Sequence, residues 1–477
     1  MMIIGGALIE ILNIVFFVYA VSLFLFYVVS AFLSAQQLRN HISQSDNLDY
    51  KSMLDYARMP TISIIAPAYN EAMTIIENIN CLLNIKYSDF EIIIVNDGSK
   101  DNTLAKVIAH FDMMPSGKVY SPQVPTSNVR NIYVSRNSAY NHLIVIDKEN
   151  GGKADALNTG INVAQGDLFL AMDVDCIVEP DALLHMVRPF IEESDAVVVA
   201  TGGVVRVANS CEVEYGKVVK VRFPTNIWAA FQVLEYFRAF TLGRMAWARI
   251  NGLLIISGAF GLFDRKRVLA VGGYDRTTVG EDLELVVRLR RYMYEVEKRK
   301  HRVAFIPDPL CWTEVPESTK ILSRQRNRWM RGAIETIQRH RKMILNPRYG
   351  IVGMLSFPFW VLFEWLAPII QLAGILYVVF LTLIGYLNVW VFLTMAAFVL
   401  SFAIMYSFFG ILFEAMTYYR YRDPGYLLKS LLLSVVEMFV YQPMNMYYAL
   451  TGNYDIFISK KQKHWGDMTR KGFTKKT

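Results

Sequence analysis

The sequence predicts an α/β domain built on a mainly parallel sheet and joined to helices that cross a membrane. Between residues 61 and 310, short runs rich in β-branched residues alternate with more polar stretches of helical length, which is typical of such a sheet with helices on both faces. Long apolar segments lie before and after this region. The 477 residues are 53% hydrophobic and only 19% charged, as expected for a chain partly dissolved in lipid.

The first element is an apolar segment, residues 1–34, which is long enough to cross a bilayer at about 1.5 Å per residue. A cleaved signal peptide is the alternative, but no Lys or Arg precedes the apolar run and the run is too long. Arg39, Lys51 and Arg58 follow it, and basic flanks favour the cytoplasmic side. We therefore expect the N-terminus outside, a juxtamembrane linker at residues 35–60 and the next domain in the cytoplasm.

Residues 61–310 form the predicted α/β domain. Its clearest strands are residues 61–65, 91–95 and 142–146. The stretch 112–137 contains several Pro, Ser and Asn residues, so we expect a surface excursion between two strand–helix units. A sheet of this kind binds ligands at the carboxyl ends of its strands, where the candidate functional residues are therefore expected.

The last third of the chain predicts a return to the membrane. Residues 311–350 include a basic amphipathic stretch suited to a membrane surface, and residues 351–413 predict two spans. Residues 414–458 contain polar groups, including Glu437 and Gln442, so an interfacial helix, a re-entrant helix and a third span all stay open. The basic tail, residues 459–477, favours the cytoplasm.

The net charge and the cysteines indicate which partners and which compartment to expect. The net charge of +7 suits an anionic leaflet; nucleic acid would also attract it, but no nucleic-acid motif is present, so we expect no such partner. The cysteines have neither zinc spacing nor a Cys-x-x-Cys pair. They predict ordinary thiols in a reducing compartment.

The most specific chemical pattern lies between residues 150 and 175. Lys153 follows two glycines and opens a predicted helix, and Asp173 and Asp175 end an apolar run with one residue between them. Side chains at i and i+2 of a strand lie on one face, so both carboxylates could serve one metal site while Lys153 meets a phosphate. Solvation of a loop is the alternative role for the two aspartates.

Two motifs upstream also follow predicted strands. Tyr69 and Glu71 lie in a turn that contains a proline, where backbone N–H groups and a tyrosine ring could meet a nucleotide base. Asp97 ends the next strand and could accept hydrogen bonds from a base or ribose. An ordinary turn is the alternative for the first motif and a helix N-cap for the second.

Two motifs downstream predict an acceptor site. Ser257 and Gly258 follow an apolar run and could form the floor of a sugar pocket. A packed turn is the alternative for these two residues. Glu281 and Asp282 precede a helical pattern. Asp282 could remove a proton from an acceptor hydroxyl, and capping of the helix by both carboxylates is the competing role.

The last motif is Gln325-x-x-Arg328-Trp329, which spans about one and a half helical turns. Arginine suits a pyrophosphate, and tryptophan offers a flat face to a sugar ring. An anchor at the membrane interface is the alternative for this basic and aromatic sequence.

In this order the motifs resemble the processive family-2 glycosyltransferases, the group of poly-N-acetylglucosamine, hyaluronan, chitin and cellulose synthases. The resemblance covers roughly residues 60–345 and the flanking membrane segments. It rests on Asp97, Lys153, Asp173-x-Asp175, Gly280-Glu281-Asp282 and Gln325-x-x-Arg328-Trp329. The last of these is its most specific part, because relatives that add a single sugar usually lack it.

The resemblance implies a GT-A fold, which is Rossmann-like, and inverting transfer from a UDP-sugar with Mg²⁺ or Mn²⁺ on the diphosphate. Asp282 would be the catalytic base and Asp175 the metal ligand. The residues that bind the nucleotide or donor would be Tyr69, Glu71, Asp97, Lys153, Asp173, Asp175 and Arg328. The residues that bind the acceptor would be Ser257, Gly258, Glu281, Gln325 and Trp329, beside a channel through the membrane helices.

A weaker similarity lies in the tail. Residues Trp465 to Arg470 are similar to the Trp-Gly-Thr-Arg gating segment of hyaluronan synthases, with two residues inserted before Thr-Arg, and add Trp465 and Arg470 to the donor side. Gly280 stands where threonine is commoner in the family. We also expect no room for the cyclic-dinucleotide domain of the large cellulose synthases, so the compact plan is closer to poly-N-acetylglucosamine synthases.

We therefore expect a multi-pass enzyme of the inner membrane, with a cytoplasmic catalytic domain, that polymerises a UDP-sugar and passes the β-linked polysaccharide across the bilayer. The expected partners are the UDP-sugar, the growing polysaccharide and the lipid bilayer, with a small accessory membrane subunit as a further candidate. The poly-N-acetylglucosamine type comes first. Hyaluronan, chitin or cellulose types, a non-processive glycolipid glycosyltransferase and a membrane protein that only binds nucleotides are the alternatives.

Overall fold

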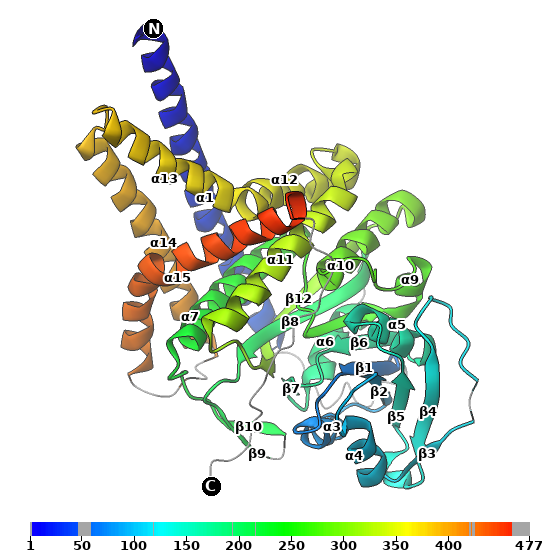
Figure 1. Cartoon of the computed structure of the whole chain (residues 1–477). Helices are drawn as coiled ribbons and strands as arrows, with labels where there is room; N and C mark the ends of the chain where they lie inside the picture. The colour runs from blue at the N-terminus through cyan, green and yellow to red at the C-terminus, as the bar shows by residue number, and fades with distance from the viewer. Residues whose placement is uncertain are drawn as a thin grey trace.

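The computed structural model has two parts (Figure 1). One is a ten-stranded sheet covered by helices, and the other is a group of long apolar helices. The structure describes residues 2–45, 59–117, 119–192, 194–214, 216–418, 421 and 425–459. Trp465 and Arg470, predicted for the donor side, lie outside the described residues.

The centre of the sheet is parallel, as the sequence predicts. The strand order is β3-β4-β5-β2-β1-β6-β11-β8-β12-β7. The four strands β5, β2, β1 and β6 pair in parallel, and β8 pairs in parallel with β12, whereas β11 runs antiparallel between β6 and β8. The strands are β1 (Ile62–Ala68), β2 (Phe90–Asp97), β3 (Met113–Pro115), β4 (Val129–Ser135), β5 (Leu143–Lys148), β6 (Leu168–Met172), β7 (Ile177–Val178), β8 (Val197–Val207), β11 (Phe260–Asp264) and β12 (His301–Thr313).

The central strands are buried along almost their whole length, because helices cover both faces of the sheet (Figure 1). Helix α5 packs on β1 and β2, while α6 packs on β8 and β12. The helices of this domain include α3 (Ile75–Leu83), α4 (Thr103–His110), α5 (Lys153–Val163), α6 (Ala182–Ile191), α7 (Ile227–Tyr236), α8 (Met245–Arg249), α9 (Arg265–Ala270), α10 (Glu281–Tyr292) and α11 (Thr319–Arg339). A separate hairpin pairs β9 (Glu212–Glu214) with β10 (Lys217–Lys220).

The three strands named from the sequence are confirmed as β1, β2 and β5. The predicted excursion at residues 112–137 is wrong in part, because β3 and β4 lie within it and extend the edge of the sheet. Ile132 is the one buried position among the seven residues of β4, so this strand carries a weaker apolar pattern than the central strands.

Three described helices are long and apolar enough to cross a membrane, judged by length and composition: α1 (Met2–Ser45), α14 (Val389–Thr417) and α15 (Tyr426–Phe457). A fourth candidate is a helix pair, residues Val352–Trp365 and Ala367–Leu383, which bends by 47°. Helices α1, α13 (Ala367–Leu383) and α14 extend away from the sheet, whereas α15 runs along α11 (Figure 1). Residues 426–457 therefore form one unbroken helix beside the α/β domain.

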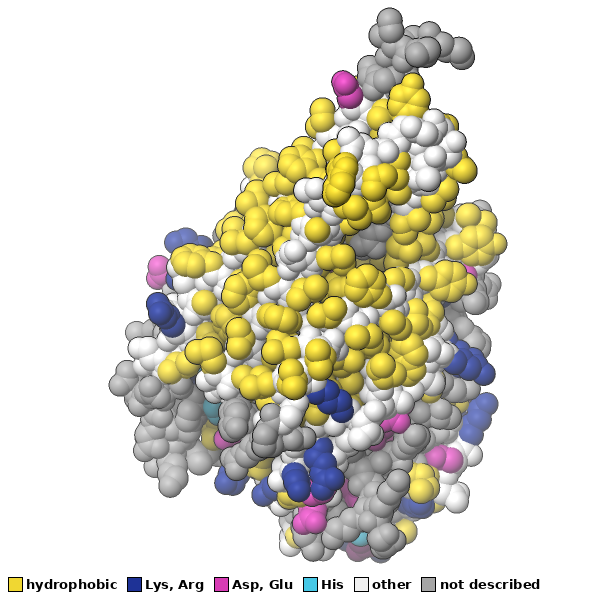
Figure 2. Space-filling view, turned by 90° about the vertical axis from the view of Figure 1, so that its left-hand side faces the viewer, with side chains coloured by type: hydrophobic (Ala, Val, Ile, Leu, Met, Phe, Trp, Pro, Cys, Tyr) yellow, Lys and Arg dark blue, Asp and Glu magenta, His cyan; other side chains and the backbone are white. Residues whose placement is uncertain are grey.

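The long helices expose large apolar side chains to the surroundings. Examples are Ile14, Phe17, Leu376, Phe380, Trp390, Leu393, Leu432 and Phe439. Figure 2 shows one face on which apolar side chains cover a broad area, with most of the charged side chains gathered below it. A face of this size has no counterpart in ordinary soluble monomers, so these helices associate the chain with a membrane.

Candidate active site

The candidate site begins at the carboxyl ends of β2 and β5, where Asp97 lies opposite Lys148 in the parallel register. The Asp97 carboxylate accepts hydrogen bonds from the Lys148 ammonium at 2.7 Å and from the N–H groups of Gly151 at 2.9 Å and Gly152 at 2.8 Å. The side-chain amide of Asn150 donates to the backbone carbonyl of Asp97 at 2.8 Å. In this structure Asp97 therefore holds the Gly-Gly loop in shape, and its contact with a nucleotide stays a prediction.

Behind this loop lies a buried chain of charges that the sequence did not reveal. Lys148, which is fully buried, also pairs with Asp155 of α5 at 2.7 Å. Asp155 accepts a further hydrogen bond from Arg276 at 2.7 Å. Burial alone would raise the pKa of Asp155, but the hydrogen bonds from Lys148 and Arg276 lower it. The carboxylate is therefore ionised and fixes the first turn of α5 against the loop.

Lys153 opens α5 and points toward the end of β6. Its ammonium pairs with the Asp173 carboxylate and donates to the Gly258 carbonyl at 3.1 Å. Burial alone would lower the pKa of Lys153, but the carboxylates of Asp173 and Glu281 raise it above its ordinary value. The structure thus brings together Lys153 and Asp173, as the sequence predicts, and keeps a positive charge beside them.

Asp173 and Asp175 follow β6 directly, and with Cys176 they form a group whose ligand atoms all lie within 4.8 Å of one another. Asp175 and Cys176 are buried. A hydrogen bond with Cys311, together with burial, raises the pKa of Cys176 well above its ordinary value, so this thiol is neutral. Two carboxylate oxygens beside a neutral thiol fit a hard divalent cation such as Mg²⁺ or Mn²⁺, with the carboxylates as its ligands.

Gly258 joins this group to the predicted base. Its carbonyl accepts from Lys153, and its N–H donates to Asp282 Oδ2 at 3.0 Å. A Cβ atom at this position would lie 2.8 Å from the same carboxylate oxygen. Only glycine lets the Asp282 side chain approach this closely, so Gly258 is the residue that contacts both Lys153 and Asp282.

Asp282 lies in the first turn of α10, where Leu283 N–H donates to its Oδ1 at 2.8 Å. Its neighbour Glu281 is buried, and the Lys153 ammonium lies 4.0 Å from Glu281 Oε1. Burial raises the pKa of Glu281, Lys153 opposes this shift, and the nearby Asp282 adds to it. The two acidic residues therefore differ in setting, with Asp282 held as a hydrogen-bond acceptor at the helix N-terminus.

The glycine that precedes this pair, Gly280, has a packing role. A Cβ atom at Gly280 would lie 2.7 Å from the Cα atom of Gly332 in α11. The two backbones touch, and a threonine at position 280 would separate them. This chain has glycine instead of the commoner threonine at position 280 because α10 and α11 meet there through two glycines.

Helix α11 carries the three residues of the last motif. Trp329 is 42% exposed, and the Arg326 guanidinium lies 4.3 Å from the centre of its ring. Gln325 Oε1 is buried and has no hydrogen-bond partner among the described residues. The charge of Arg328 acts on Glu281, so this helix reaches the acidic pair of α10.

Arg326, which the sequence analysis did not select, anchors α11 to two other helices. Its guanidinium donates to the two carboxylate oxygens of Glu235 in α7, at 2.6 and 2.7 Å, and to the Tyr441 hydroxyl in α15 at 2.9 Å. A bidentate arginine–carboxylate pair fixes orientation as well as distance. No signal in the sequence set Arg326 apart from the arginines at positions 324 and 328.

The remaining predicted residues lie at neighbouring strand ends. Tyr69 follows β1 and is 38% exposed. Glu71 N–H donates to Thr103 at 2.8 Å, which ties this turn to α4. Ser257 precedes β11, and its hydroxyl accepts from Ala259 N–H at 3.3 Å. These three residues belong to the same edge of the sheet, and their contacts with ligands stay predictions.

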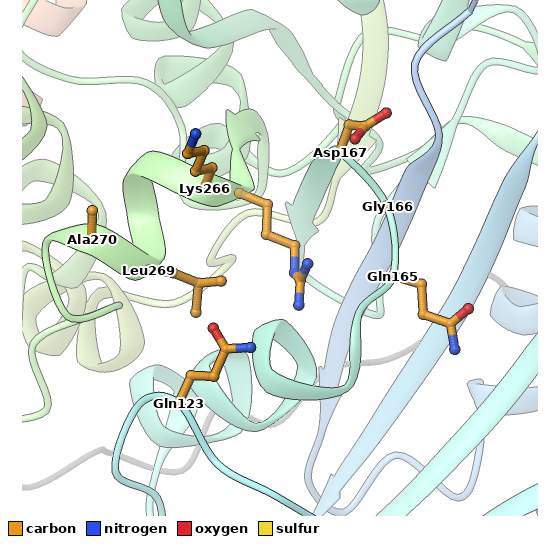
Figure 3. Close-up of a pocket in the computed structure, with 8 residues that line it drawn as sticks. Gln123, Gln165, Gly166, Asp167, Lys266, Leu269 and Ala270 are labelled. Carbon is orange, nitrogen blue, oxygen red and sulfur yellow. The ribbon is translucent and has the colours of Figure 1, made fainter.

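A cavity of about 520 Å³ lies elsewhere (Figure 3). Its lining includes Asp167, which precedes β6, and Lys266 and Leu269 of α9. Asp173 follows the other end of β6. The cavity therefore opens at the edge of the sheet opposite to Lys153 and Asp173, and it is separate from the candidate site.

Two family models match the chain. Residues 60–332 match the model described as glycosyltransferase like family 2, and residues 275–463 match the model described as chitin synthase. The first match spans Tyr69, the earliest residue of the candidate site, through Trp329, the last. The second extends over the long helices as far as α15.

Curated proteins with similar sequences include poly-beta-1,6-N-acetyl-D-glucosamine synthases. The chain is 27% identical to that of Staphylococcus epidermidis over 285 residues, which is 60% of this chain and 57% of the relative. It is 29% identical to that of Staphylococcus aureus (strain COL) over 294 residues, 61% of this chain and 59% of the relative. The chain thus spans less than two thirds of the length of these relatives.

A solved structure with a similar fold is the mannosyltransferase PcManGT from Pyrobaculum calidifontis in complex with GDP-Man and Mn²⁺. It has a TM-score of 0.50 and 17% sequence identity, over 86% of this chain and 98% of that chain. The likeness concerns the fold, and with the family match it confirms the predicted GT-A architecture.

Proposed function

The chain belongs to the glycosyltransferase-like family 2, and from this premise we propose that it is a processive polysaccharide synthase. The proposed donor is a UDP-sugar, and the proposed product is a β-linked chain of the poly-N-acetylglucosamine type. The names of the two staphylococcal relatives support this choice of sugar. Hyaluronan, chitin or cellulose types and a non-processive glycolipid transferase are the alternatives.

The observation that carries the proposal is the bridge at Gly258. Lys153, suited to a diphosphate, contacts the carbonyl of this residue, and Asp282, suited to a hydroxyl, contacts its N–H. A cation for the leaving group and a base for the attacking group thus contact the backbone of the same residue. Transfer of a sugar from a nucleoside diphosphate to a hydroxyl needs both groups at such a separation.

In the proposed reaction, the Asp282 carboxylate accepts the proton of the acceptor hydroxyl. The hydroxyl oxygen attacks the anomeric carbon of the donor sugar, the bond from that carbon to the diphosphate oxygen breaks, and UDP departs from the opposite face with inversion. Asp173 and Asp175 would hold a divalent cation, which supplies positive charge for the leaving diphosphate. Lys153 adds a second positive charge on the same side.

We also propose how the acceptor reaches the site. Trp329 would stack on a sugar ring of the growing chain, and Gln325 would accept a hydrogen bond from one of its hydroxyls. Helix α11 carries both residues and runs along α15, so the end of the chain would lie where the catalytic domain meets the apolar helices. We further propose export through those helices, with the catalytic domain in the cytoplasm; the contact of α11 with α15 and the basic flanks of the apolar segments support this proposal.

The test is incorporation of radiolabel by purified protein in lipid vesicles, with a panel of UDP-sugars and either Mg²⁺ or Mn²⁺. We expect UDP-N-acetylglucosamine to give long products that a β-1,6-specific hexosaminidase digests. Products limited to one added sugar would overturn processivity, and digestion by another linkage-specific hydrolase would overturn the linkage. Absence of incorporation from every UDP-sugar would overturn the donor class.

A further inference from the structure

Three arginines beside the apolar helices are paired with carboxylates: Arg206 with Glu414, Arg238 with Glu437 and Arg326 with Glu235. Arg244 differs from these three. Within the described part of the chain, its Nε and Nη1 atoms are buried without a hydrogen-bond partner, and it forms no ion pair. Leaving buried guanidinium donors unused is costly, so the position calls for an explanation.

Arg244 is the last residue of η2 (Phe237–Arg244), a π-helical segment between α7 and α8. This segment contacts α1 and α14 on one side and strands β8 and β12 on the other. The Phe240 ring lies 3.9 Å from the Arg244 guanidinium and covers one of its faces. The side chain is therefore held in a fixed orientation where the sheet domain meets the apolar helices, and π-helical turns of this kind are frequent at functional sites.

The groups that act electrostatically on Arg244 are Tyr236, Asp282, Glu364 and Glu235. Burial lowers the pKa of Arg244 to about 10, and these four groups oppose that shift, so the guanidinium is charged at neutral pH. Two of the carboxylates already have partners, because Gly258 N–H donates to Asp282 and Arg326 donates to Glu235. The charge of the predicted base, Asp282, thus acts on Arg244, and the two side chains form no ion pair within the described residues.

The charges that act on Arg244 favour a neutral sugar over a diphosphate as its ligand. A diphosphate would bring further negative charge to a guanidinium on which the charges of Asp282 and Glu235 already act, whereas a neutral sugar brings oxygen acceptors without charge. The cation suited to the diphosphate, Lys153, is hydrogen-bonded to the other side of Gly258. The unused donors of Arg244 therefore match the hydroxyl and amide oxygens of a sugar on the acceptor side.

We propose that Arg244 binds the terminal sugar of the acceptor chain, through hydrogen bonds from its guanidinium to oxygens next to the hydroxyl that Asp282 deprotonates. Gln325, whose Oε1 is also buried without a described partner, offers the complementary acceptor for a sugar hydroxyl. Arg244 thus supplies a cation on the acceptor side, whereas Lys153 and Arg328 are assigned to the donor side. This inference rests on the proposed function, because it needs a sugar acceptor.

The test compares Arg244→Gln and Arg244→Lys with Arg249→Gln in the full chain in lipid vesicles. Arg249 is the matched control, since it is an exposed arginine one helix further on. The probes are UDP-N-acetylglucosamine and a β-1,6-linked N-acetylglucosamine oligosaccharide. We expect Arg244→Gln to raise the KM for the oligosaccharide at least about tenfold and to leave the KM for the UDP-sugar within about twofold, because a hydrogen bond to a charged group is lost on one substrate only.

Arg244→Lys should restore part of the affinity for the oligosaccharide, and Arg249→Gln should match the wild type. An unchanged oligosaccharide KM, or a rise confined to the UDP-sugar, would overturn the inference while leaving the proposed function intact. Wild-type protein that elongates no oligosaccharide would instead overturn the proposed function. Should Arg244→Gln fail to fold, as judged by its thermal transition, the same pair of KM values for Arg244→Lys decides the question.

Discussion

The donor half and the acceptor half of the candidate site are built in opposite ways. On the donor half, the carboxylates of Asp97 and Asp155 share the buried Lys148 ammonium, and the loop N–H groups of Gly151 and Gly152 complete the network. On the acceptor half, buried polar atoms of Arg244 and Gln325 have no partners within the described residues. The Lys148 network of the donor half is made by the protein's own groups, whereas these atoms of the acceptor half leave hydrogen bonds for a ligand to make.

This difference matches what each half is proposed to do. A donor site must hold the same nucleotide in the same position at every cycle, so a preorganised and rigid setting favours rapid transfer. An acceptor site of a processive enzyme must release its sugar and accept the next one. Polar atoms that bind a sugar but are not locked into the protein's own network permit such exchange. The following predictions test whether the two halves differ in this way.

The largest expected effect is on the donor half, from Lys148→Met. Removing the ammonium leaves Asp97 and Asp155 as buried carboxylates without their shared cation, which should cost about 3 to 5 kcal/mol of unfolding free energy. Thermal or denaturant unfolding in detergent measures this loss of unfolding free energy. Lys106→Met is the control, because Lys106 is exposed. Equal stability of the two variants would contradict the view that the donor loop rests on this network.

A somewhat smaller effect is expected at the bridge between the halves, from Gly258→Ala. The added Cβ atom would meet Asp282 Oδ2 at 2.8 Å and displace the base, which should lower kcat by roughly a hundredfold. Gly374→Ala is the control, since its Cβ atom would make an ordinary contact with Phe16 at 3.4 Å. A Gly258→Ala enzyme with normal kcat would show that the position of the base does not depend on the absence of a side chain at residue 258.

The smallest expected effect is a contrast in pH dependence between the halves. The lowered pKa of Asp155 contributes stability that is present above about 3.9, its pKa in the unfolded chain, and is lost as the pH falls through the folded value. The raised pKa of Glu281 has the opposite effect on stability. At a pH above the pKa of Glu281 in the folded protein, the ionised carboxylate destabilises the fold. This destabilisation disappears at acidic pH, where the group is protonated.

Melting temperatures across the pH range compare Asp155→Asn and Glu281→Gln with the wild type. At neutral pH we expect Asp155→Asn to be less stable and Glu281→Gln to be at least as stable as the wild type. Both differences should shrink toward acidic pH. A loss of stability of similar size in both variants at neutral pH would remove the proposed contrast.

The sequence predicted the fold and the edge of the sheet where the site lies, for physical reasons. Apolar runs such as residues 91–95 form central strands because helices cover both faces, and parallel strands bring Asp97 and Asp173 to one edge. Strands β3 and β4 were missed because strands near the edge of the sheet are less buried and carry a weaker apolar pattern. Burial of Lys148 was signalled only by its place at the end of an apolar run.

What the sequence could not predict are contacts between distant segments. The pairing of Arg326 with Glu235 and Tyr441 joins three helices that lie far apart in the chain. The isolation of Arg244 is likewise a property of its surroundings, since neighbouring Arg238 has a carboxylate partner. Asp97 illustrates the same limit, because its oxygens are occupied by the loop that follows β5.

The most direct test of the account is a paired measurement on Asp282→Asn, the conservative change at the proposed base. Binding of UDP-N-acetylglucosamine, measured by calorimetry with Mn²⁺, and release of UDP during elongation are compared with the wild type. The account predicts unchanged donor affinity and a rate of elongation lower by about 10² to 10⁴. Elongation at the wild-type rate would contradict the assignment of Asp282 and with it the division of the site into a donor half and an acceptor half.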